Sequence, residues 1–353
     1  MFITLSRLVL RNSGYNLSVK KFPVLEVKGT YIDIGRAIGE EFKSTIQDTI
    51  AKRKVQIANY NSYLSKVSEY FNFTKSIFPN LIVETEAIAK SANVDVLDYF
   101  FINCCEVYDI SEQQDKIDAA NHDHCTIVVS FNRYGAIVGH NEDWQNGSPE
   151  KLFILKVTNE NGSFISLSYK NCIAGNAASM NNFGLVQCIN DLNPVSQFGV
   201  PQNYLARAVL ECETLDEAES LIRNTKRASG FNHVLVQGRE VRNIEIAADQ
   251  IAVERSIENA YVHTNHYTSL EMQVFEKFHT NSSEARYQRA RELVKNEMTF
   301  VDAKDFLSDT QNIEYPICRA DATLGSVIAI PQRNEFWACY NHPCAGEYFQ
   351  YLN

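Results

Sequence analysis

The sequence predicts an α+β fold in which antiparallel sheets are covered by helices, because two periodicities divide the 353-residue chain. In the first third, apolar residues recur between charged ones at the spacing of amphipathic helices. After Cys125 the apolar residues alternate with period two, and β-branched residues become frequent, as in strands. The stretch 111–124 between these regions is polar and rich in Asp, Gln and His, which is typical of a linker.

The helical segments expected before this linker are Ile32–Ser68, Asn80–Ala92 and Asp95–Val107. Within the first of them, Gly35 and Gly39 are four residues apart and therefore share one helical face. At the N-terminus, Met1–Leu10 is a short apolar stretch that contains Arg7 and lacks a small-residue cleavage site. We interpret it as an N-terminal strand and not as a secretion signal.

The strands expected after Cys125 are separated by gaps of hairpin length and comprise Thr126–Phe131, Ala136–His140, Leu152–Thr158, Ser163–Tyr169, Gly184–Ile189, Val234–Gln237, Leu324–Ile330 and Glu335–Tyr340. Helical spacing returns at Asn203–Arg223 and Ser283–Asn296, with a shorter helix at Val301–Ser308. No internal repeat or low-complexity tract is found in the sequence.

The composition is that of a folded protein, with 45% hydrophobic and 22% charged residues. The net charge is -10, and no basic stripe of the kind that binds nucleic acid is present, so we expect no nucleic-acid partner. No run of about 18 apolar residues occurs, so no membrane-spanning helix is expected. The nine cysteines are odd in number and lack a C-x-x-C pair, which predicts reduced thiols and a cytoplasmic location.

The most informative segment is a predicted hairpin that runs from Cys125 to Trp144. Its turn, Asn132 to Gly135, contains residue types that favour tight turns. Pairing about this turn places Cys125 opposite Glu142, with Asn141 and Asp143 as diagonal neighbours. A thiol, two carboxylates and an amide are therefore expected to meet at one end of a sheet, where the linker enters it.

This arrangement calls for an unusual base, because acidic neighbours raise the pKa of a thiol. If the peptide bond before Cys125 were cleaved, the new α-amino group, with a reference pKa of about 8, could accept the thiol proton. The Asp143 carboxylate would then orient this amine. The alternative is that Cys125 is a buried strand residue and 141–144 a polar turn.

Several dispersed motifs resemble the peptidase C45 family of N-terminal-nucleophile hydrolases, and the resemblance extends over most of the chain. The matching segments are Val27–Gly39, Asp123–Thr126, Gly139–Trp144, Ser179–Leu185 with Ile189–Asn190, His263–His266, Cys318–Arg319, Thr323–Leu324 and Pro343–Cys344. The resemblance implies an αββα four-layer sandwich, with antiparallel sheets between helical layers, and an amide hydrolase or acyltransferase without cofactor. Its partner would be a small-molecule amide or acyl donor, acyl-coenzyme A included.

The resemblance also implies autoproteolysis between His124 and Cys125, which makes Cys125 a new N-terminus oriented by Asp143. Residues 1–124 and 125–353 would then be associated fragments of one compact domain, and assembly into a homo-oligomer is left open. The family usually has glycine before its nucleophile, where this chain has His124. Glycine reaches the strained geometry of an N-to-S acyl shift at little cost, whereas a histidine could serve as a proton shuttle.

Other site residues follow from the same resemblance. Asn232 is similar to the oxyanion-hole side chain, Asn190 is a second candidate for that hole, and Arg319 resembles a site-organising arginine. The residues expected to contact the substrate are Trp144, Asn141, His266 and Tyr267.

The sequence is also compatible with three other functions. His122, His124 and Cys125, with His140 nearby, could bind a metal, although the usual zinc spacing is absent. A papain-like dyad could join His263 or His266 to one of the other cysteines, Cys339 and Cys344 being considered. Finally, the chain could be a binding or scaffold protein that keeps the fold without the cleavage.

Overall fold

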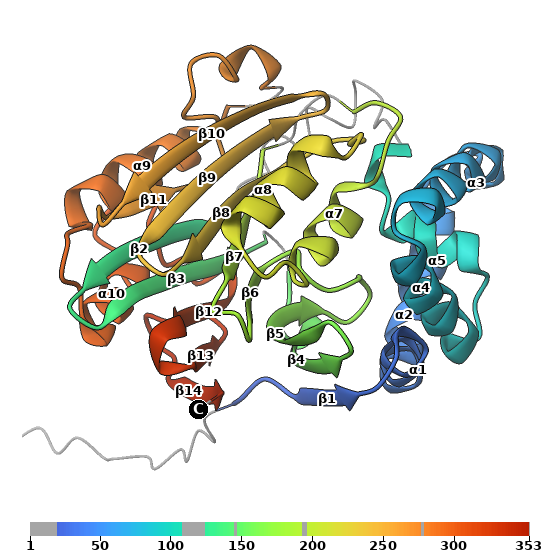
Figure 1. Ribbon diagram of the computed structural model, residues 1–353, viewed down its shortest axis with the longest axis horizontal. Helices are drawn as coiled ribbons and strands as arrows, with labels where there is room; N and C mark the ends of the chain where they lie inside the picture. Colours follow the sequence, from blue (N-terminus) through green and yellow to red (C-terminus); the bar gives the residue numbers. More distant parts are fainter. Residues whose placement is uncertain (1–19, 108–123, 145–146, 193–195, 277–278, 353) are drawn as a thin grey trace, which may run out of the picture.

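The computed structural model describes residues 20–107, 124–144, 147–192, 196–276 and 279–352. The predicted strand Met1–Leu10 and the linker, except His124, lie outside the described residues. Within the described residues, the strands form one eight-stranded and one six-stranded sheet, with helices on both sides (Figure 1). No helix in these ranges is both long and apolar enough to cross a bilayer.

The larger sheet has the spatial order β1 (Val24–Lys28), β4 (Leu152–Asn159), β5 (Gly162–Tyr169), β6 (Ala178–Asn181), β7 (Val186–Asp191), β8 (Phe231–Gln237), β9 (Glu240–Ala247) and β10 (Gln250–Ile257). The smaller sheet has the order β11 (Tyr261–His263), β2 (Thr126–Asn132), β3 (Gly135–Asp143), β12 (Thr323–Ile330), β13 (Glu335–Tyr340) and β14 (Tyr348–Leu352). Pairing is antiparallel throughout except between β1 and β4, which are parallel.

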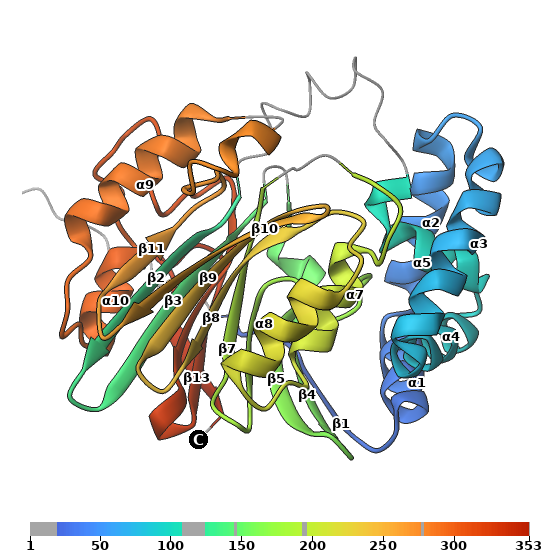
Figure 2. The same ribbon diagram turned by 45° about the horizontal axis from the view of Figure 1, so that its top comes forward.

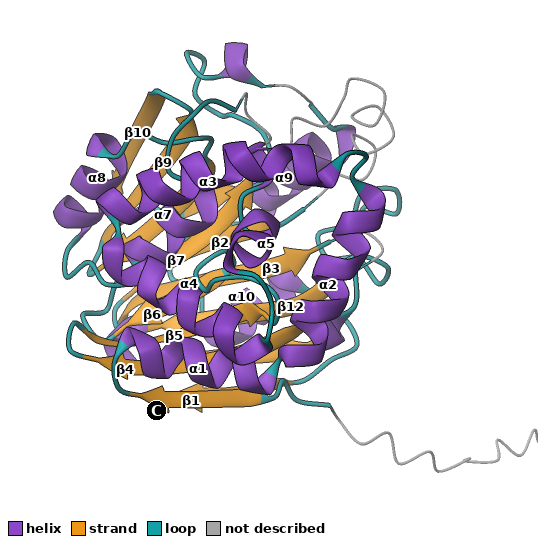
Figure 3. Ribbon diagram, turned by 90° about the vertical axis from the view of Figure 1, so that its right-hand side faces the viewer, coloured by secondary structure: helices purple, strands orange, loops and turns teal. Residues whose placement is uncertain are grey.

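The helices are α1 (Tyr31–Glu41), α2 (Lys43–Gln56), α3 (Tyr60–Ile77), α4 (Pro79–Ala92), α5 (Val96–Ile102), α7 (Gln202–Val209), α8 (Leu215–Asn224), α9 (Asn281–Leu293) and α10 (Phe300–Leu307). Short 3₁₀ turns occupy Cys105–Val107, Pro149–Lys151, Gln273–Phe275 and Pro331–Arg333. Helices α1–α5 lie together in front of the strands in Figure 3.

The two sheets pack face to face, and their alternating side chains make the four layers. On β2, Ile127 and Val129 point into the core between the sheets, whereas Val128 points outward to α9 and α10. On β4, Ile154 faces the other sheet, and Leu155 faces a layer that contains α1 and α4. Helices α7 and α8 cover β8 and β9 of the larger sheet (Figure 2). The predicted αββα sandwich is confirmed.

The shared face of Gly35 and Gly39 is also confirmed, because it is where α1 meets α4. A Cβ atom on Gly35 would lie 2.3 Å from the Glu84 carbonyl oxygen, so the two backbones approach closely. The single helix predicted for Ile32–Ser68 is wrong. The chain forms α1, α2 and the start of α3 there, and left-handed Asn59, with φ 57°, precedes α3.

The predicted helix Asn203–Arg223 is likewise two helices, α7 and α8. The Thr214 hydroxyl accepts a hydrogen bond from Glu217 N and so begins α8, while the Asn181 amide donates to the carbonyls of Leu210 and Cys212 after α7. Strands β1, β6, β9, β10, β11 and β14 were not predicted. Strand β9 was missed because it contains polar residues such as Glu245, which interrupt the apolar pattern and find their partners on other elements.

A buried ion pair joins α7 to the N-terminal helices. The fully buried Arg207 guanidinium donates to Glu84 Oε2 at 2.9 Å and to Glu211 Oε1 at 3.0 Å. Burial raises the pKa of Glu84, and the charge of Arg207 opposes this rise. The ion pair therefore opposes protonation of a carboxyl group that is buried inside the helical layer.

We expect Arg207→Met to lower the free energy of unfolding by about 3–5 kcal/mol, because it leaves the Glu84 carboxylate buried without a counter-charge. Urea denaturation measures this change. The double variant with Glu84→Met should lose less than the single variant, and Lys75→Met, which removes the exposed pair with Glu86, should cost less than about 1 kcal/mol. Equal losses in Arg207→Met and Lys75→Met would contradict the expectation.

Candidate active site

The hairpin that carries Cys125 has the predicted register. Asn132 pairs with Gly135 and Thr126 with Asn141, so the next position outward sets Cys125 opposite Glu142. The Cys125 thiol lies 3.5 Å from Glu142 Oε2, as donor to it, and the residue is only 5% exposed. The thiol and the carboxylate therefore meet in the interior.

The Glu142 carboxylate is held from both sheets. His140 Nε2 lies 2.9 Å from Glu142 Oε2, on the same strand. Tyr169, at the end of β5 in the larger sheet, donates its hydroxyl hydrogen to Glu142 Oε1 at 2.6 Å. No sequence signal marks Tyr169 as a site residue, because its contact with Glu142 depends on how the two sheets pack.

The surroundings of Cys125 disfavour the thiolate. Burial raises the pKa of the Cys125 thiol well above its ordinary value, and the charges of Glu142 and Asp143 raise it further. A neutral thiol at physiological pH needs a base to become a nucleophile. The direction of this shift agrees with the expectation drawn from the hairpin.

This environment predicts a pH dependence of alkylation. In chains with an intact His124–Cys125 bond, we expect iodoacetamide to modify Cys125 only above the ordinary pH range of thiols. Glu142→Gln should move the profile to lower pH, because it removes the negative charge beside Sγ. Mass spectrometry of peptides spanning the bond measures the rate at each pH, with exposed Glu150→Gln as control. An unchanged profile in Glu142→Gln would disprove the electrostatic cause.

Arg319 connects the peptide bond before Cys125 to Asp143. Its Nη2 donates to the His124 carbonyl oxygen and to Asp143 Oδ2, each at 2.8 Å. Asp143 is fully buried, and its Oδ1 has no hydrogen-bond partner among the described residues. One guanidinium nitrogen thus lies between the carbonyl oxygen of the bond and the carboxylate.

His124 is packed in place and does not extend as a free linker residue. Its ring lies 4.7 Å from the Trp144 ring, measured between centroids, at an interplanar angle of 30°. Its Nδ1 lies 3.3 Å from the Asp143 carbonyl oxygen. His124 is 3% exposed and Trp144 is 48% exposed, so the indole lies between the imidazole and the surface.

A second arginine at the site, Arg286 of α9, was missed by the sequence analysis. The Arg286 Nη1 donates to the Cys125 carbonyl oxygen and to Thr126 Oγ1, both at 2.8 Å. Its Nη2 donates to Asn265 Oδ1 at 3.1 Å. Arg286 is fully buried on a helix whose other residues are mostly polar, so no sequence signal sets it apart from a surface arginine.

Asn190 and Asn232 are cross-strand neighbours on β7 and β8. Asn190 Nδ2 donates to the Thr264 carbonyl oxygen at 2.7 Å and lies 3.0 Å from His263 Nδ1. His263 pairs with Ile127, so Asn190 lies near the start of the nucleophile strand. Asn232 Nδ2 donates to Asn243. An oxyanion hole needs these N–H groups to turn towards substrate, and their role stays a prediction.

His263 belongs to a buried acid–base pair. Its Nε2 lies 3.0 Å from Glu245 Oε1. Burial acts to raise the pKa of Glu245, but hydrogen bonds from His263 and Thr268 outweigh it and lower the pKa to about 2. Glu245 is therefore an anion, and the His263 ring lies between its carboxylate and the Asn190 side chain.

The remaining predicted contact residues bond to other protein groups. Asn141 donates to the carbonyls of Leu307 and Ile317. His266 is buried beside Ser283, with Nδ1 2.8 Å from its Oγ, and burial lowers the His266 pKa to about 4. The completely buried Tyr267 donates its hydroxyl hydrogen to a backbone carbonyl oxygen of β9. Substrate binding by these side chains stays a prediction.

Comparison with known proteins gives the chain a family. Residues 131–342, more than half of the chain, match the family described as acyl-coenzyme A:6-aminopenicillanic acid acyl-transferase. The chain belongs to this family. The matched range includes Asp143, Asn190, Asn232 and Arg319, and it begins six residues after Cys125.

A curated relative of the chain is a β-alanyl-dopamine/carcinine hydrolase of Drosophila melanogaster, which is 23% identical over 221 residues. The match covers 57% of this chain and 57% of the relative, so the chain spans little more than half the length of that protein. Similar solved structures include a mutant conjugated bile acid hydrolase from Clostridium perfringens and a penicillin V acylase from Agrobacterium tumefaciens. The first is 11% identical with a TM-score of 0.47, covering 64% of this chain and 96% of that one. The second is 12% identical with a TM-score of 0.42, covering 64% and 85%.

The structure also bears on the two other chemical sites considered from the sequence, the metal site near Cys125 and the papain-like dyad. His122 lies outside the described residues, and the ligand atoms that meet near Cys125 belong to Cys125, His140 and Glu142, all within 4.8 Å of one another. For the dyad, His263 pairs with Glu245 and Asn190, and His266 with Ser283. Among the described residues, neither histidine forms a hydrogen bond or an ion pair with Cys339 or Cys344.

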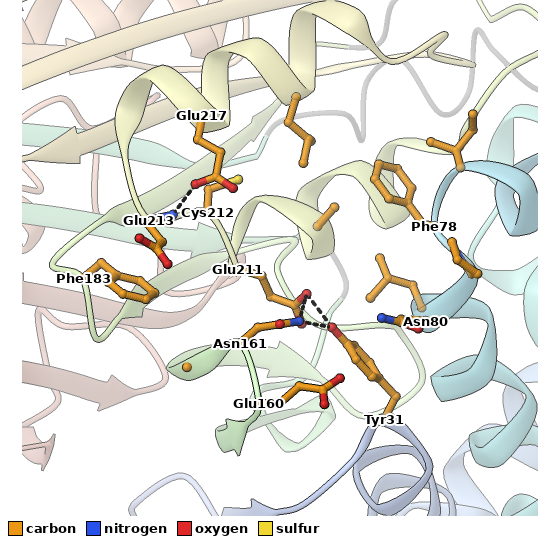
Figure 4. A pocket seen from close by; sticks show the side chains of 16 residues that line it. Tyr31, Phe78, Asn80, Glu160, Asn161, Phe183, Glu211, Cys212, Glu213 and Glu217 are labelled. Carbon is orange, nitrogen blue, oxygen red and sulfur yellow. Dashed lines mark hydrogen bonds between the residues drawn. The ribbon is translucent and has the colours of Figure 1, made fainter.

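A pocket elsewhere on the molecule is separate from Cys125. It has a volume of about 640 Å³ and lies between the N-terminal helices and the α7–α8 region (Figure 4). Tyr31 donates its hydroxyl hydrogen to Glu211 on its wall, and Asn161, Phe78 and Glu217 also line it. None of the candidate site residues lines this pocket.

Proposed function

We propose that the protein is a cysteine N-terminal-nucleophile enzyme that cleaves its own chain between His124 and Cys125. It then hydrolyses or transfers the acyl group of a small-molecule amide or acyl donor through a Cys125 thioester. The contact that carries the proposal is Arg319 Nη2, which donates to both the His124 carbonyl oxygen and Asp143 Oδ2. Family membership supports the same reaction class.

Self-cleavage begins with attack of Cys125 Sγ on the His124 carbonyl carbon. Arg319 polarises that carbonyl, because its hydrogen bond stabilises the negative charge that develops on the oxygen. The C–N bond breaks, the Cys125 nitrogen takes up a proton and becomes an amine, and a thioester joins His124 to Sγ. Water then hydrolyses the thioester, which leaves a carboxylate on His124 and a free thiol on Cys125.

In the mature enzyme the Cys125 amine acts as the base. It accepts the thiol proton while Sγ attacks the substrate carbonyl, and it returns a proton to the departing amine or thiol. The buried Asp143 Oδ1 accepts a hydrogen bond from this amine, which gives the unpartnered oxygen a function. Asn232 and Asn190 are the proposed donors to the oxyanion. Water or a second amine then resolves the thioester.

The substrate is proposed to be a small amide, thioester or other acyl donor. The family description names an acyl transfer from coenzyme A to 6-aminopenicillanic acid, and the fly relative is named as a hydrolase of β-alanyl-dopamine and carcinine. Both reactions begin with attack on an acyl carbonyl. Hydrolysis and transfer differ only in whether water or an amine accepts the acyl group.

The test is intact mass and N-terminal sequencing of the purified protein. We expect two chains that co-elute under native conditions, the second beginning with Cys125. Incubation with an activated ester should leave the acyl group on a peptide that contains Cys125. A single chain of 40.1 kDa that gains no acyl group would overturn the proposal.

A binding protein that does not cleave is the second candidate, and His124 is the observation that favours it. Its ring is packed on Trp144, so the backbone before Cys125 lacks the freedom of the family's usual glycine. This candidate predicts an intact chain that binds a small amide and leaves it unchanged. The same mass measurement separates the two.

A further inference from the structure

Three soft metal ligands meet near the C-terminus, away from Cys125. Cys318, His342 and Cys344 each offer one ligand atom, and these atoms all lie within 4.8 Å of one another. His342 Nδ1 lies 3.3 Å from Cys344 Sγ. Neither the proposed reaction nor the pocket between the helices uses any of these residues.

Two separate segments bring the ligands together. Cys318 lies in the connection between α10 and β12, where its N–H donates to the Asp309 carbonyl oxygen at 2.9 Å. His342 and Cys344 follow β13, and the chain turns there at Asn341, which has a φ of 68°. The Cys344 N–H donates to Cys318 Sγ at 3.2 Å, which binds one segment to the other. The juxtaposition is therefore built by backbone contacts.

The geometry and the ligand types fit zinc. Tetrahedral zinc has bonds of about 2.3 Å to sulfur and about 2.0 Å to nitrogen, so its ligand atoms are roughly 3.3–3.8 Å apart. The 3.3 Å contact between His342 Nδ1 and Cys344 Sγ has this length. Cys318 Sγ lies within 4.8 Å of the ligand atoms of both residues, so small side-chain rotations bring all three ligand atoms to the distances that zinc requires. Thiolate and imidazole are ligands that select zinc over magnesium or calcium.

The backbone hydrogen bond to Cys318 Sγ is a second feature of a ligand site. Hydrogen bonds from the surroundings orient metal ligands and tune their basicity. Burial raises the pKa of the Cys318 thiol, and the hydrogen bond from the Cys344 N–H opposes this rise. Cys318 is 1% exposed, His342 is half-buried and Cys344 is exposed, so the cluster opens to solvent on one side.

We propose that Cys318, His342 and Cys344 bind one zinc ion, with a water molecule as the fourth ligand on the exposed side. The two thiols release their protons to solvent as they become thiolates, and the neutral imidazole binds through Nδ1. No electron is transferred. The charges of Zn²⁺ and two thiolates cancel, which suits a site that is buried on one side.

The location suggests what the ion does. Cys318 directly precedes Arg319, so zinc would tie the loop that carries Arg319 to the segment after β13. Zinc then holds Arg319 in place, and His342 and Cys344 position Arg319 through the ion. This consequence rests on the proposed function, whereas metal binding itself does not.

The test measures zinc affinity by competition with a chromophoric chelator, in reduced protein and without oxygen. Cys125→Ala is the background, because it removes the other cluster of Cys125, His140 and Glu142. We expect one zinc per chain. Cys344→Ser and His342→Ala should each weaken binding by about 100-fold or more, since even an outer partner costs about 10–100-fold. Cys172→Ser is the matched control and should leave the affinity unchanged.

Two further measurements do not depend on catalysis. Cobalt(II) should give a tetrahedral spectrum with a thiolate charge-transfer band, and this band should be lost in Cys344→Ser. Zinc should raise the thermal midpoint of the parent protein, and a chelator should reverse the rise. Absence of bound metal, or equal affinity in Cys344→Ser, would overturn the proposal.

Failure of the zinc proposal and failure of the proposed function are distinguishable. If zinc binds as expected but the wild-type chain stays intact and unacylated, only the proposed function is wrong. If the chain cleaves and becomes acylated but no variant alters metal binding, only the zinc site is wrong.

Discussion

Cys125→Ala is expected to leave one continuous chain of 40.1 kDa and to reduce turnover to background. In the proposed mechanism, the variant removes the sulfur that attacks the His124 carbonyl and that later carries the acyl group. Without cleavage, the Cys125 position also lacks the amine that serves as base. Denaturing electrophoresis with intact mass measures the cleavage, and release of product from an amide or activated ester measures turnover.

Two variants make this result specific. Cys125→Ser should cleave and turn over more slowly, because a hydroxyl is a weaker nucleophile than a thiol. Cys188→Ala removes a cysteine that is equally buried, in the core between the sheets, and should retain cleavage and turnover. Cleavage in Cys125→Ala, or an equal loss in Cys188→Ala, would exclude Cys125 as the nucleophile.

Asp143→Asn is expected to lower kcat/KM by about 10²–10³-fold, a loss typical of removing one charge-stabilising group from an active site. The amide cannot balance the positive charge of the Cys125 amine, and it weakens the bond with Arg319 Nη2. The pH–rate profile should change in a defined direction. In the proposed mechanism Asp143 stabilises the protonated amine and so raises the pKa of that amine. In Asp143→Asn we therefore expect the acidic limb of the profile to move to lower pH.

The control for this variant is Asp48→Asn, an exposed position on α2. It should leave both the rate and the profile unchanged. Circular dichroism and the midpoint of unfolding show whether Asp143→Asn retains the fold, because Asp143 is fully buried. A lower rate with an unmoved acidic limb would assign Asp143 a structural role alone.

Local features of the hairpin were predictable from the sequence. Asn132 and Gly135 specify a tight turn, and a turn sets the register of the two strands that it joins. Cys125 therefore had to lie opposite Glu142 once the turn was identified. Runs of apolar and β-branched residues likewise predicted most strands that are buried on both faces, such as Leu152–Asn159.

The environment of those residues was not predictable in the same way. Arg319 and Arg286 contact the backbone on either side of the His124–Cys125 bond, although they lie more than 150 residues further along the chain. Arg286 looks like any other arginine in the sequence, and Arg319 was singled out only through the resemblance to a known family. Tyr267 packs in a core cluster and donates to a β9 carbonyl oxygen, because the packing of β9 and the following segments sets its direction. Its contact with the substrate stays a prediction.

The sequence by itself determined which residues face one another across the Cys125 hairpin, because turn chemistry and strand alternation act over a few neighbouring residues. Only the tertiary structure decided which groups from other elements surround the hairpin. Arg319, Arg286 and Tyr169 reach the hairpin because the two sheets and α9 pack around it. Burial there removes the water that would otherwise screen them, and so makes their charges and hydrogen bonds decisive for the chemistry of Cys125.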